Sequence, residues 1–294
     1  MKKELFYYFY IDSDDYYEVY KLHLECLKDY INVFNKVNII LSLDDINNTY
    51  YIDLWKDRIT TYLQYNEDIN FIIVQNDVKY REGIHFYNLI FSQLYKFDSL
   101  IFWGHGKRDF YYDKNNIYNW ISGMHYLNSL NINEIENILV SYNNQYCVHG
   151  PFIEYYNFMP NNLFYWGAIY WLYPKKILDL FIEQYNITNE YYLNILYFDN
   201  NDDIQFDNKI MYSIAENWMS SFLLLKNMHH YQIGPIKNMH FLKNNILYSY
   251  YDPYIYSLDH IKEYFNEDLF NNMIDYCNNI KSTIIDVKEK ENTY

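Results

Sequence analysis

The sequence predicts an α/β fold, with a mostly parallel sheet flanked by helices. Four nearly continuous apolar runs of strand length occur in the first third of the chain, and such runs suit strands that are buried on both faces. The stretches between them have helical period, and a strand–helix unit of about thirty residues is typical of βαβ crossovers. The four runs are Leu5–Ile11, Val37–Leu43, Ile69–Gln75 and Ser99–Trp103.

The helices expected between these strands each carry one apolar stripe. They span Tyr16–Phe34, Leu54–Leu63 and Phe86–Phe97. Alternation of such helices with buried strands favours a parallel sheet of the Rossmann-like type.

After Asp109 the chain becomes more helical and more polar. A long aromatic strand is expected at Leu163–Leu172, and its internal Gly167 indicates a bulge or a close approach by a ligand. No repeat and no Pro-, Gly- or Ser-rich linker is visible, so we expect one domain over residues 1–227, with residues 228–294 as a helical elaboration packed on it. Further helices are expected at Asn116–Leu130, Asn133–Val140, Lys175–Gln184, Ile210–Asn227 and Ile261–Ile285.

Composition narrows the class of protein. The formal net charge is −15, which disfavours general binding to nucleic acid, because the summed field repels a phosphate-coated polymer. The Tyr and Asn bias is typical of an AT-rich genome, so a cluster of tyrosines is weak evidence for a site. Apolar runs are shorter than the roughly 18–20 residues of a membrane span. Three widely spaced cysteines favour a reducing compartment, and a cytoplasmic protein is expected.

Polar residues follow each of the four predicted strands. The first strand is followed by Asp12 and Ser13, the second by Asp44 and Asp45, and the third by Asn76 and Asp77. Asp and Asn at such places are common helix caps and turn formers. Because the carboxyl ends of parallel strands share one edge, where open α/β sheets bind ligands, the joint pattern favours a binding site.

The fourth strand leads into Gly104-His105-Gly106-Lys107-Arg108. Two glycines around a histidine, followed by cationic side chains, predict a flexible loop that receives an anion, and Lys or Arg can neutralise a phosphate oxygen. The alternative is a strand followed by an ordinary turn with a solvated basic cluster.

The chain resembles a family of GT-A-like glycosyltransferases with a His-x-Lys-Gly-type loop, found in polysaccharide gene clusters and large DNA viruses. The order of four motifs between about Leu5 and Leu225 carries the resemblance. Gly106 and Arg108 replace the family's Thr and final Gly, and Gly167 stands in a different frame from the usual Gly-Asn. The motifs are the loop at 104–108, Trp120 on the next helix, the aromatic strand 164–171, and Glu216-Asn217-Trp218.

The resemblance implies transfer of a sugar from a UDP- or GDP-sugar donor to a glycan or protein-linked acceptor. No Asp-x-Asp pair follows the fourth strand, so we expect no required cofactor, with a divalent metal disfavoured. Lys107 is expected to stabilise the leaving diphosphate, with His105 as a second donor and Arg108 as a weaker candidate. For His105 the alternative is a structural histidine bonded to a carbonyl. Glu216 is the expected base, and a helix-surface glutamate is the alternative.

The remaining candidates contact the donor. Asp12, Asn76 and Asp77 are expected at the ribose and base, with simple capping as the alternative. Trp166, beside Gly167, and Trp171 are expected to stack on a sugar ring, although aromatic residues of an interior strand are more often part of the core. A non-catalytic GT-A-like module that binds carbohydrate or protein is the alternative function, since the loop and strand motifs depart from the family pattern.

Overall fold

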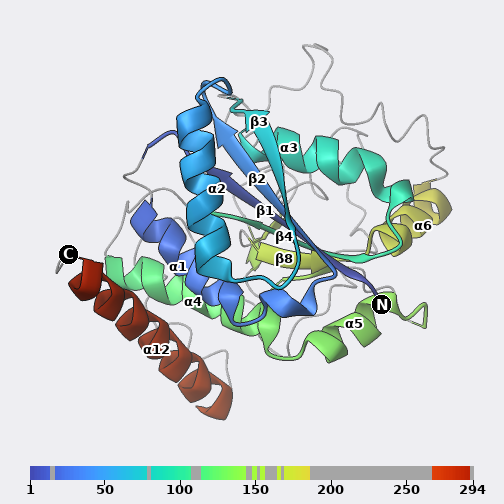
Figure 1. Ribbon diagram of the computed structural model, residues 1–294. Helices are drawn as coiled ribbons and strands as arrows, with labels where there is room; N and C mark the ends of the chain where they lie inside the picture. Colours follow the sequence, from blue (N-terminus) through green and yellow to red (C-terminus); the bar gives the residue numbers. More distant parts are fainter. Residues whose placement is uncertain are drawn as a thin grey trace.

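A computed structural model describes most of the first two thirds of the chain and a C-terminal helix. The described residues are 1–13, 17–77, 81–106, 114–143, 148–150, 153–155, 164–166, 169–185 and 267–291. The polypeptide in these ranges forms an α/β fold with helices on both faces of a central sheet (Figure 1).

The main sheet has six strands in the order β3-β2-β1-β4-β8-β5. The first four strands of this order are mutually parallel, whereas β8 runs antiparallel to β4 and β5 antiparallel to β8. The chain therefore builds outward from β1 to β3 and then returns to place β4 on the other side of β1. The strands are β1 (Lys3–Tyr10), β2 (Lys36–Leu43), β3 (Ile69–Gln75), β4 (Leu100–His105), β5 (Val148–His149) and β8 (Ile169–Leu172).

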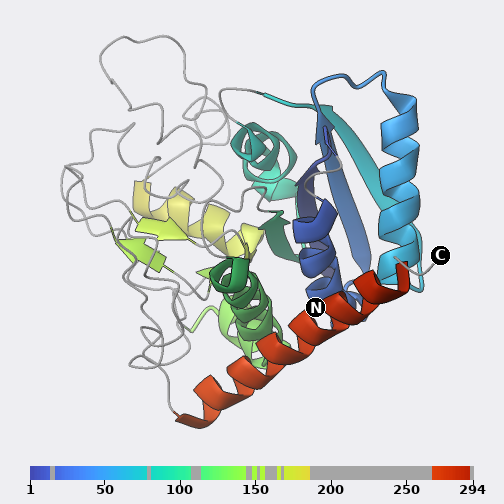
Figure 2. The same ribbon diagram turned by 90° about the vertical axis from the view of Figure 1, so that its left-hand side faces the viewer.

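Helices cover the two faces of the sheet in separate layers (Figures 1 and 2). One face carries α1 (Tyr17–Lys28), α2 (Thr49–Leu63) and α4 (Lys114–Ser129). The other carries α3 (Glu82–Leu89) and α6 (Pro174–Tyr185). The shorter elements are the 3-10 helices η2 (Ile31–Val33) and η3 (Phe91–Lys96) and the helix α5 (Ile132–Val140).

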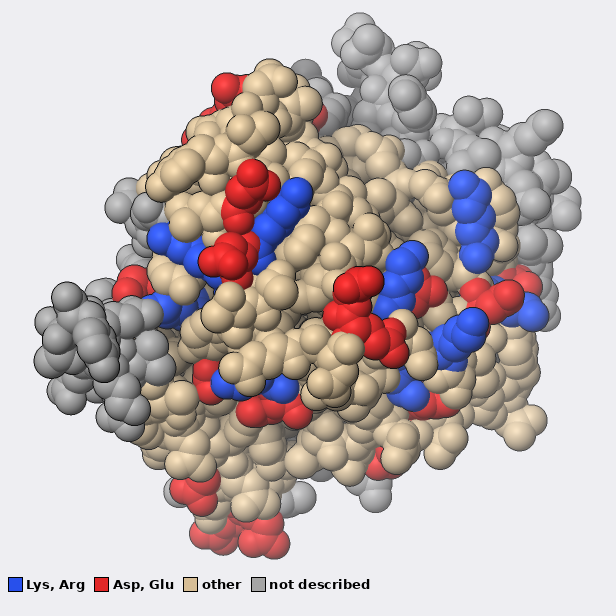
Figure 3. Space-filling view, viewed as in Figure 1, with Lys and Arg blue, Asp and Glu red and all other residues tan. Residues whose placement is uncertain are grey.

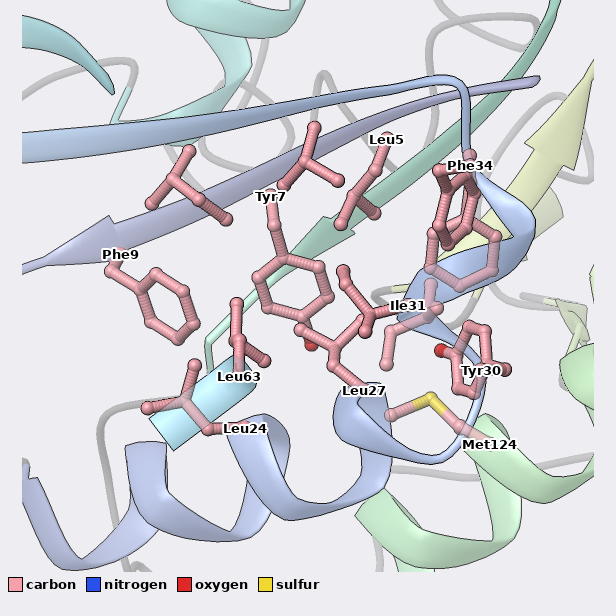
Figure 4. Packing of buried hydrophobic residues seen from close by; sticks show 14 of the residues in the cluster. Leu5, Tyr7, Phe9, Leu24, Leu27, Tyr30, Ile31, Phe34, Leu63 and Met124 are labelled. Carbon is pink, nitrogen blue, oxygen red and sulfur yellow. The ribbon is translucent and has the colours of Figure 1, made fainter. Parts of the chain in front are cut away.

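The main core lies between the sheet and the layer of α1, α2 and α4. Alternate residues of β1 point toward this layer, and Leu5, Tyr7 and Phe9 are fully buried there against Leu24 and Leu27 of α1 (Figure 4). Burying one such side chain contributes about 1.5–3 kcal/mol. Because the other face is also covered, the strands are apolar at nearly every position, as the continuous runs predict.

Aromatic packing fills the opposite face of the sheet. Phe6 of β1 meets Phe97 edge to face at 6.0 Å, and Phe86 of α3 meets Trp103 of β4 at 5.0 Å. Phe86 also meets Tyr170 of β8 at 6.2 Å, so α3 is fixed over β4 and β8. Edge-to-face contacts of this kind add to the area that each ring buries.

The last described helix, α12 (Glu267–Glu291), packs across α4 and α1 (Figure 2). Met273 is fully buried, and the Cys277 Sγ lies 3.7 Å from the carbonyl oxygen of Asn119 on α4. Cys277 and Cys26 of α1 are buried free thiols. Residues 228–266 lie outside the described residues, so the structure reports only this helix of the expected elaboration.

The structure confirms the predicted α/β class and all four early strands, with small shifts at their ends. The predicted helices at 16–34 and 86–97 each divide, because the α-helix ends at Lys28 or Leu89 and a 3-10 turn follows. Within the described ranges no helix is long and apolar enough to span a bilayer.

The single aromatic strand predicted at Leu163–Leu172 is wrong. β7 (Phe164–Trp166) pairs with β6 (Ile153–Tyr155) in a separate two-stranded sheet, whereas β8 pairs with β4 in the main sheet. The apolar run is continuous in sequence, but its two halves find different partners, and hydropathy alone carries no information on pairing.

Candidate functional site

The order in which the chain adds strands to the sheet reverses between β1 and β4. Connections from β1 lead toward β2 on one side, while β4 lies on the other side, so the strand order 3-2-1-4 has its switch point between these two strands. Pairing of β1 with β4 continues to the N–H of Gly106, which donates to the carbonyl oxygen of Tyr8 at 2.8 Å. Further along the chain, the backbone N–H of Ile11 donates to the carbonyl oxygen of Ser42 in β2 at 2.8 Å. The carboxyl ends at such a point form the usual ligand crevice of open α/β sheets.

Four polar residues at this edge form one hydrogen-bonded group, which we call the carboxyl-edge cluster: Tyr10, Asp12, Asp44 and Asn76. Asp44 is at its centre. Its carboxylate accepts from the Tyr10 hydroxyl at 3.0 Å and from the Asn76 side-chain amide at 2.7 Å. Its backbone N–H donates to Asp12 Oδ1 at 3.3 Å. The ends of β1, β2 and β3 are therefore linked through side chains.

The electrostatics of the carboxyl-edge cluster favour ligands that donate hydrogen bonds. Burial, the hydrogen bond to Asp44 and the charge of Asp12 together raise the pKa of Tyr10. The phenol is therefore protonated at neutral pH and remains a donor to Asp44. Asp12 and Asp44 are exposed, so their other carboxylate lone pairs can accept from hydroxyl groups, such as a vicinal diol.

His105 ends β4 beside this edge. It is half-buried, and its register partner across the switch point is Tyr8. Asp77 follows β3 and is also half-buried. The structure thus brings Asp12, Asn76, Asp77 and His105 to one edge of the sheet, as the strand-end pattern predicts.

The two glycines of the 104–108 motif have a packing role at the end of β4, whereas the rest of the predicted loop, from Lys107, lies outside the described residues. A Cβ on Gly104 would lie 2.3 Å from the Tyr7 ring, and one on Gly106 would lie 2.7 Å from the Tyr20 ring. Among the described residues no glycine has a positive φ. Both glycines let β4 approach large aromatic side chains of β1 and α1.

Several predicted site residues are outside the part that the structure describes: Lys107, Arg108, Gly167 and Glu216. Trp166 belongs to β7 in the two-stranded sheet, and its side chain is not described. The other tryptophan of this run, Trp171, is a core residue: its ring lies 4.8 Å from that of Phe102, and its Nε1–H donates to the Asn128 carbonyl at 2.9 Å.

A second polar group lies inside the main core, and we call it the buried Tyr–His cluster: Tyr7, His23, Tyr30 and His125. The Tyr7 hydroxyl lies 2.6 Å from His23 Nδ1 and 3.2 Å from His125 Nε2. The Tyr30 hydroxyl lies 2.6 Å from His125 Nδ1. Burial lowers the pKa of His125 to about 3, so its ring is neutral at pH 7.

Sequence reasoning missed Asp44 as the centre of the edge, the buried Tyr–His cluster, and His85 of α3. Asp44 follows a strand like the other candidates, but its central position depends on strand order. His85 and the buried Tyr–His cluster carry no sequence signal, since each consists of isolated residues brought together by packing.

Charge is mixed on the face of the molecule seen in Figure 3, where basic side chains lie next to acidic ones rather than in a separate patch. Throughout the described ranges, no group of three or more His, Cys, Asp or Glu side chains is arranged to hold a metal ion. Metal-independent chemistry stays a prediction.

The fold and the edge together define a class: an α/β protein with a Rossmann-like sheet and a polar switch point. Comparison with known protein families, curated proteins and solved structures gives no match. The GT-A resemblance accordingly stays a hypothesis drawn from the sequence motifs.

Proposed function

We propose that the protein is a glycosyltransferase of the GT-A-like type, which moves a sugar from a UDP- or GDP-sugar to a glycan or protein-linked acceptor. One observation carries the proposal most strongly: hydrogen bonds link the polar ends of β1, β2 and β3 at the carboxyl edge of a parallel sheet, beside its switch point. Nucleotides are common ligands of this position in open α/β folds.

The carboxyl-edge cluster takes the nucleoside half of the donor. Exposed oxygens of Asp12 and Asp44 accept from the ribose hydroxyls, while the hydrogen bonds from Tyr10 and Asn76 hold Asp44 in place. A carboxylate fixed in this way loses little side-chain entropy when the ligand binds. Asp77 lies at the end of the neighbouring strand and borders the same edge.

The diphosphate lies across the switch point, beside the end of β4. Lys107 directly follows the last described residue of this loop and neutralises the charge that develops on the leaving phosphate, with His105 and Arg108 as further donors. Glu216 removes the proton from the acceptor hydroxyl, and Trp166, beside Gly167, stacks on a sugar ring.

A panel of nucleotides tests the binding step. Since a ligand that binds only the native state raises the melting temperature, UDP, GDP and their sugars are compared with ATP by thermal shift. UDP or GDP is expected to raise the melting temperature in proportion to the logarithm of its concentration. Asp44→Asn is expected to reduce the shift, whereas Asp53→Asn, on α2 and exposed, is the control.

Activity is tested by release of UDP or GDP in the presence of acceptor glycans. Lys107→Ala and Glu216→Gln are each expected to lower turnover by about 10²-fold or more, as for loss of an oxyanion donor or a general base. EDTA is expected to leave turnover unchanged. Turnover that survives both substitutions, or that EDTA abolishes, contradicts the assigned roles. Binding of nucleotide sugar without any turnover favours the non-catalytic module.

A further inference from the structure

His85 of α3 lies on the face of the sheet opposite the main core. Its side chain is 8% exposed, and its ring stacks on that of Tyr8 at 5.7 Å between centroids and 20° between planes. Tyr8 is the register partner of His105 across the switch point. The imidazole of His85 is therefore placed directly over the strand that forms one side of the candidate site.

The hydrogen bonds of His85 leave one ring nitrogen unused. The imidazole bonds to the backbone of Gln75, at the end of β3, while the buried Nε2 has no partner among the described residues. Burial lowers the pKa of His85 to about 4, although Asp77 and the Gln75 bond act in the opposite direction. The ring is neutral at pH 7, so the nitrogen bonded to the Gln75 carbonyl carries the proton and Nε2 is an acceptor.

A buried acceptor without a donor costs about 1–3 kcal/mol and is rare in folded proteins. A second unused polar atom lies on the same side of the sheet: the Oγ of Ser42, which is fully buried and has no partner in the described part of the chain. Ser42 is the register partner of Tyr10, two residues along β1 from Tyr8. His85 Nε2 and Ser42 Oγ are thus two unsatisfied polar atoms on the same side of the sheet, near the edge that carries the candidate site.

We propose that His85 reads the nucleobase of the bound nucleotide, with Nε2 accepting a hydrogen bond from a ring N–H. Uracil and guanine carry such a ring N–H at neutral pH, whereas the corresponding ring nitrogens of cytosine and adenine are acceptors. The inference deepens the proposed function and rests on it, and it selects uridine or guanosine nucleotides.

The base rather than the ribose is assigned to His85 because of its surroundings. Tyr8 stacks on the imidazole, and the next residue of α3, Phe86, is buried against Trp103. The stack on Tyr8 and the buried Phe86 beside it fix the plane of the imidazole, so Nε2 is a single directed acceptor, which suits the ring N–H of a base edge. The exposed carboxylates of Asp12 and Asp44 suit the ribose hydroxyls instead.

Two variants of His85 separate the acceptor from the stack. His85→Phe keeps an aromatic ring over Tyr8 but removes the nitrogen, whereas His85→Gln keeps an acceptor oxygen near the position of Nε2. Tyr95→Phe, at a half-exposed side chain of η3, is the matched control. UDP, GDP, CDP and ADP are titrated into each protein by calorimetry.

The full-length protein is expected to bind UDP or GDP more tightly than CDP and ADP. His85→Phe is expected to weaken the preferred nucleotide about five- to tenfold, the value of one hydrogen bond, and to leave the others unchanged. His85→Gln is expected to retain part of the preference. An unchanged preference in His85→Phe overturns the inference and leaves the proposed function standing, whereas a full-length protein that binds none of the four nucleotides overturns both.

A measurement on the unmutated protein covers the case in which His85→Phe does not fold. The ring nitrogens of His85 are followed by long-range 1H–15N NMR while UDP or GDP is added. Formation of a hydrogen bond is expected to move the Nε2 signal upfield, away from the position of a free acceptor nitrogen. An Nε2 signal that does not move on saturation overturns the inference.

Discussion

Burial keeps His125 of the buried Tyr–His cluster neutral, and the hydrogen bonds of the cluster fit this state. With His125 neutral, the three contacts fit one consistent assignment: Tyr30 donates to His125 Nδ1, His125 donates from Nε2 to the Tyr7 oxygen, and Tyr7 donates to His23 Nδ1. In this assignment every short contact has one donor and one acceptor. An added proton at His125 Nδ1 would turn the acceptor of Tyr30 into a donor and place a charge in the main core.

Acid should therefore destabilise the protein through His125. Its folded pKa of about 3 lies below the ordinary value of about 6.5, so the unfolded chain binds the proton first. The stabilisation is fully present above pH 6.5 and is lost as pH falls toward 3, at up to about 1.4 kcal/mol per pH unit. His85, with a pKa of about 4, acts in the same direction.

Urea denaturation at pH 7.5, 6.0 and 5.0 checks this prediction, because few carboxylates titrate in that range. The free energy of unfolding is expected to fall between pH 6.0 and 5.0, with an unchanged dependence on urea. A constant free energy from pH 7.5 to 5.0 contradicts a neutral buried histidine.

Gly104 is the residue whose substitution should be least tolerated in β4. Alanine would place a Cβ 2.3 Å from the Tyr7 ring, and this ring is held by the bonds of its hydroxyl to His23 and His125. Overpacking of this kind costs about 1–3 kcal/mol. Gly150→Ala is the control, since its Cβ would lie 3.3 Å from Tyr170 Cβ and needs only a small adjustment. Equal losses in urea denaturation would contradict the packing role.

At the scale of helices and strands, the sequence predicts those elements whose burial is visible in the hydropathy pattern. β1 to β4 are continuous apolar runs because helices cover both faces, and this pattern is visible without a structure. The boundary between β7 and β8 is not visible, because β7 pairs with β6 while β8 pairs with β4. Partner choice depends on contacts that are distant in sequence, so the aromatic run predicts one strand where the structure has two.

Helix α12 adds a layer outside α1 and α4, and its buried positions should carry its contribution to stability. Met273 is fully buried in the main core cluster, whereas the adjacent Asn272 is exposed. Met273→Ala is expected to lower the free energy of unfolding by about 2–4 kcal/mol, from lost burial and the cavity that remains. Asn272→Ala is expected to change it by less than about 0.5 kcal/mol.

The measurement for α12 is chemical denaturation followed by far-UV circular dichroism. If Met273→Ala and Asn272→Ala behave alike, α12 does not pack on α4 as described. A loss confined to Met273→Ala supports a C-terminal helix that belongs to the same cooperative unit as the sheet.

At the scale of the whole molecule, the order of the strands in the sheet cannot be predicted from the sequence. Polar strand ends identify Asp12, Asn76, Asp77 and His105 as candidates, and parallel strands place them on one edge. The order 3-2-1-4 then sets β1 beside β4 and makes Asp44 the centre of the carboxyl-edge cluster. No local pattern encodes this order, because it depends on how the crossover helices pack. The sequence therefore predicts that these residues share one edge of the sheet, but it does not predict the hydrogen bonds of the carboxyl-edge cluster.

Net charge separates a nucleotide-sugar site from a nucleic-acid surface. The chain carries a formal net charge of −15, so a long polyanion is repelled along its whole length. A ligand as small as a nucleotide sugar is exposed only to the local field at the switch point. We expect no binding to a short labelled DNA duplex or RNA strand by fluorescence anisotropy, even at low salt. UDP or GDP should still raise the melting temperature under the same conditions. Association with the duplex that weakens steeply with added salt would show a basic surface that outweighs the net charge, and would contradict this prediction.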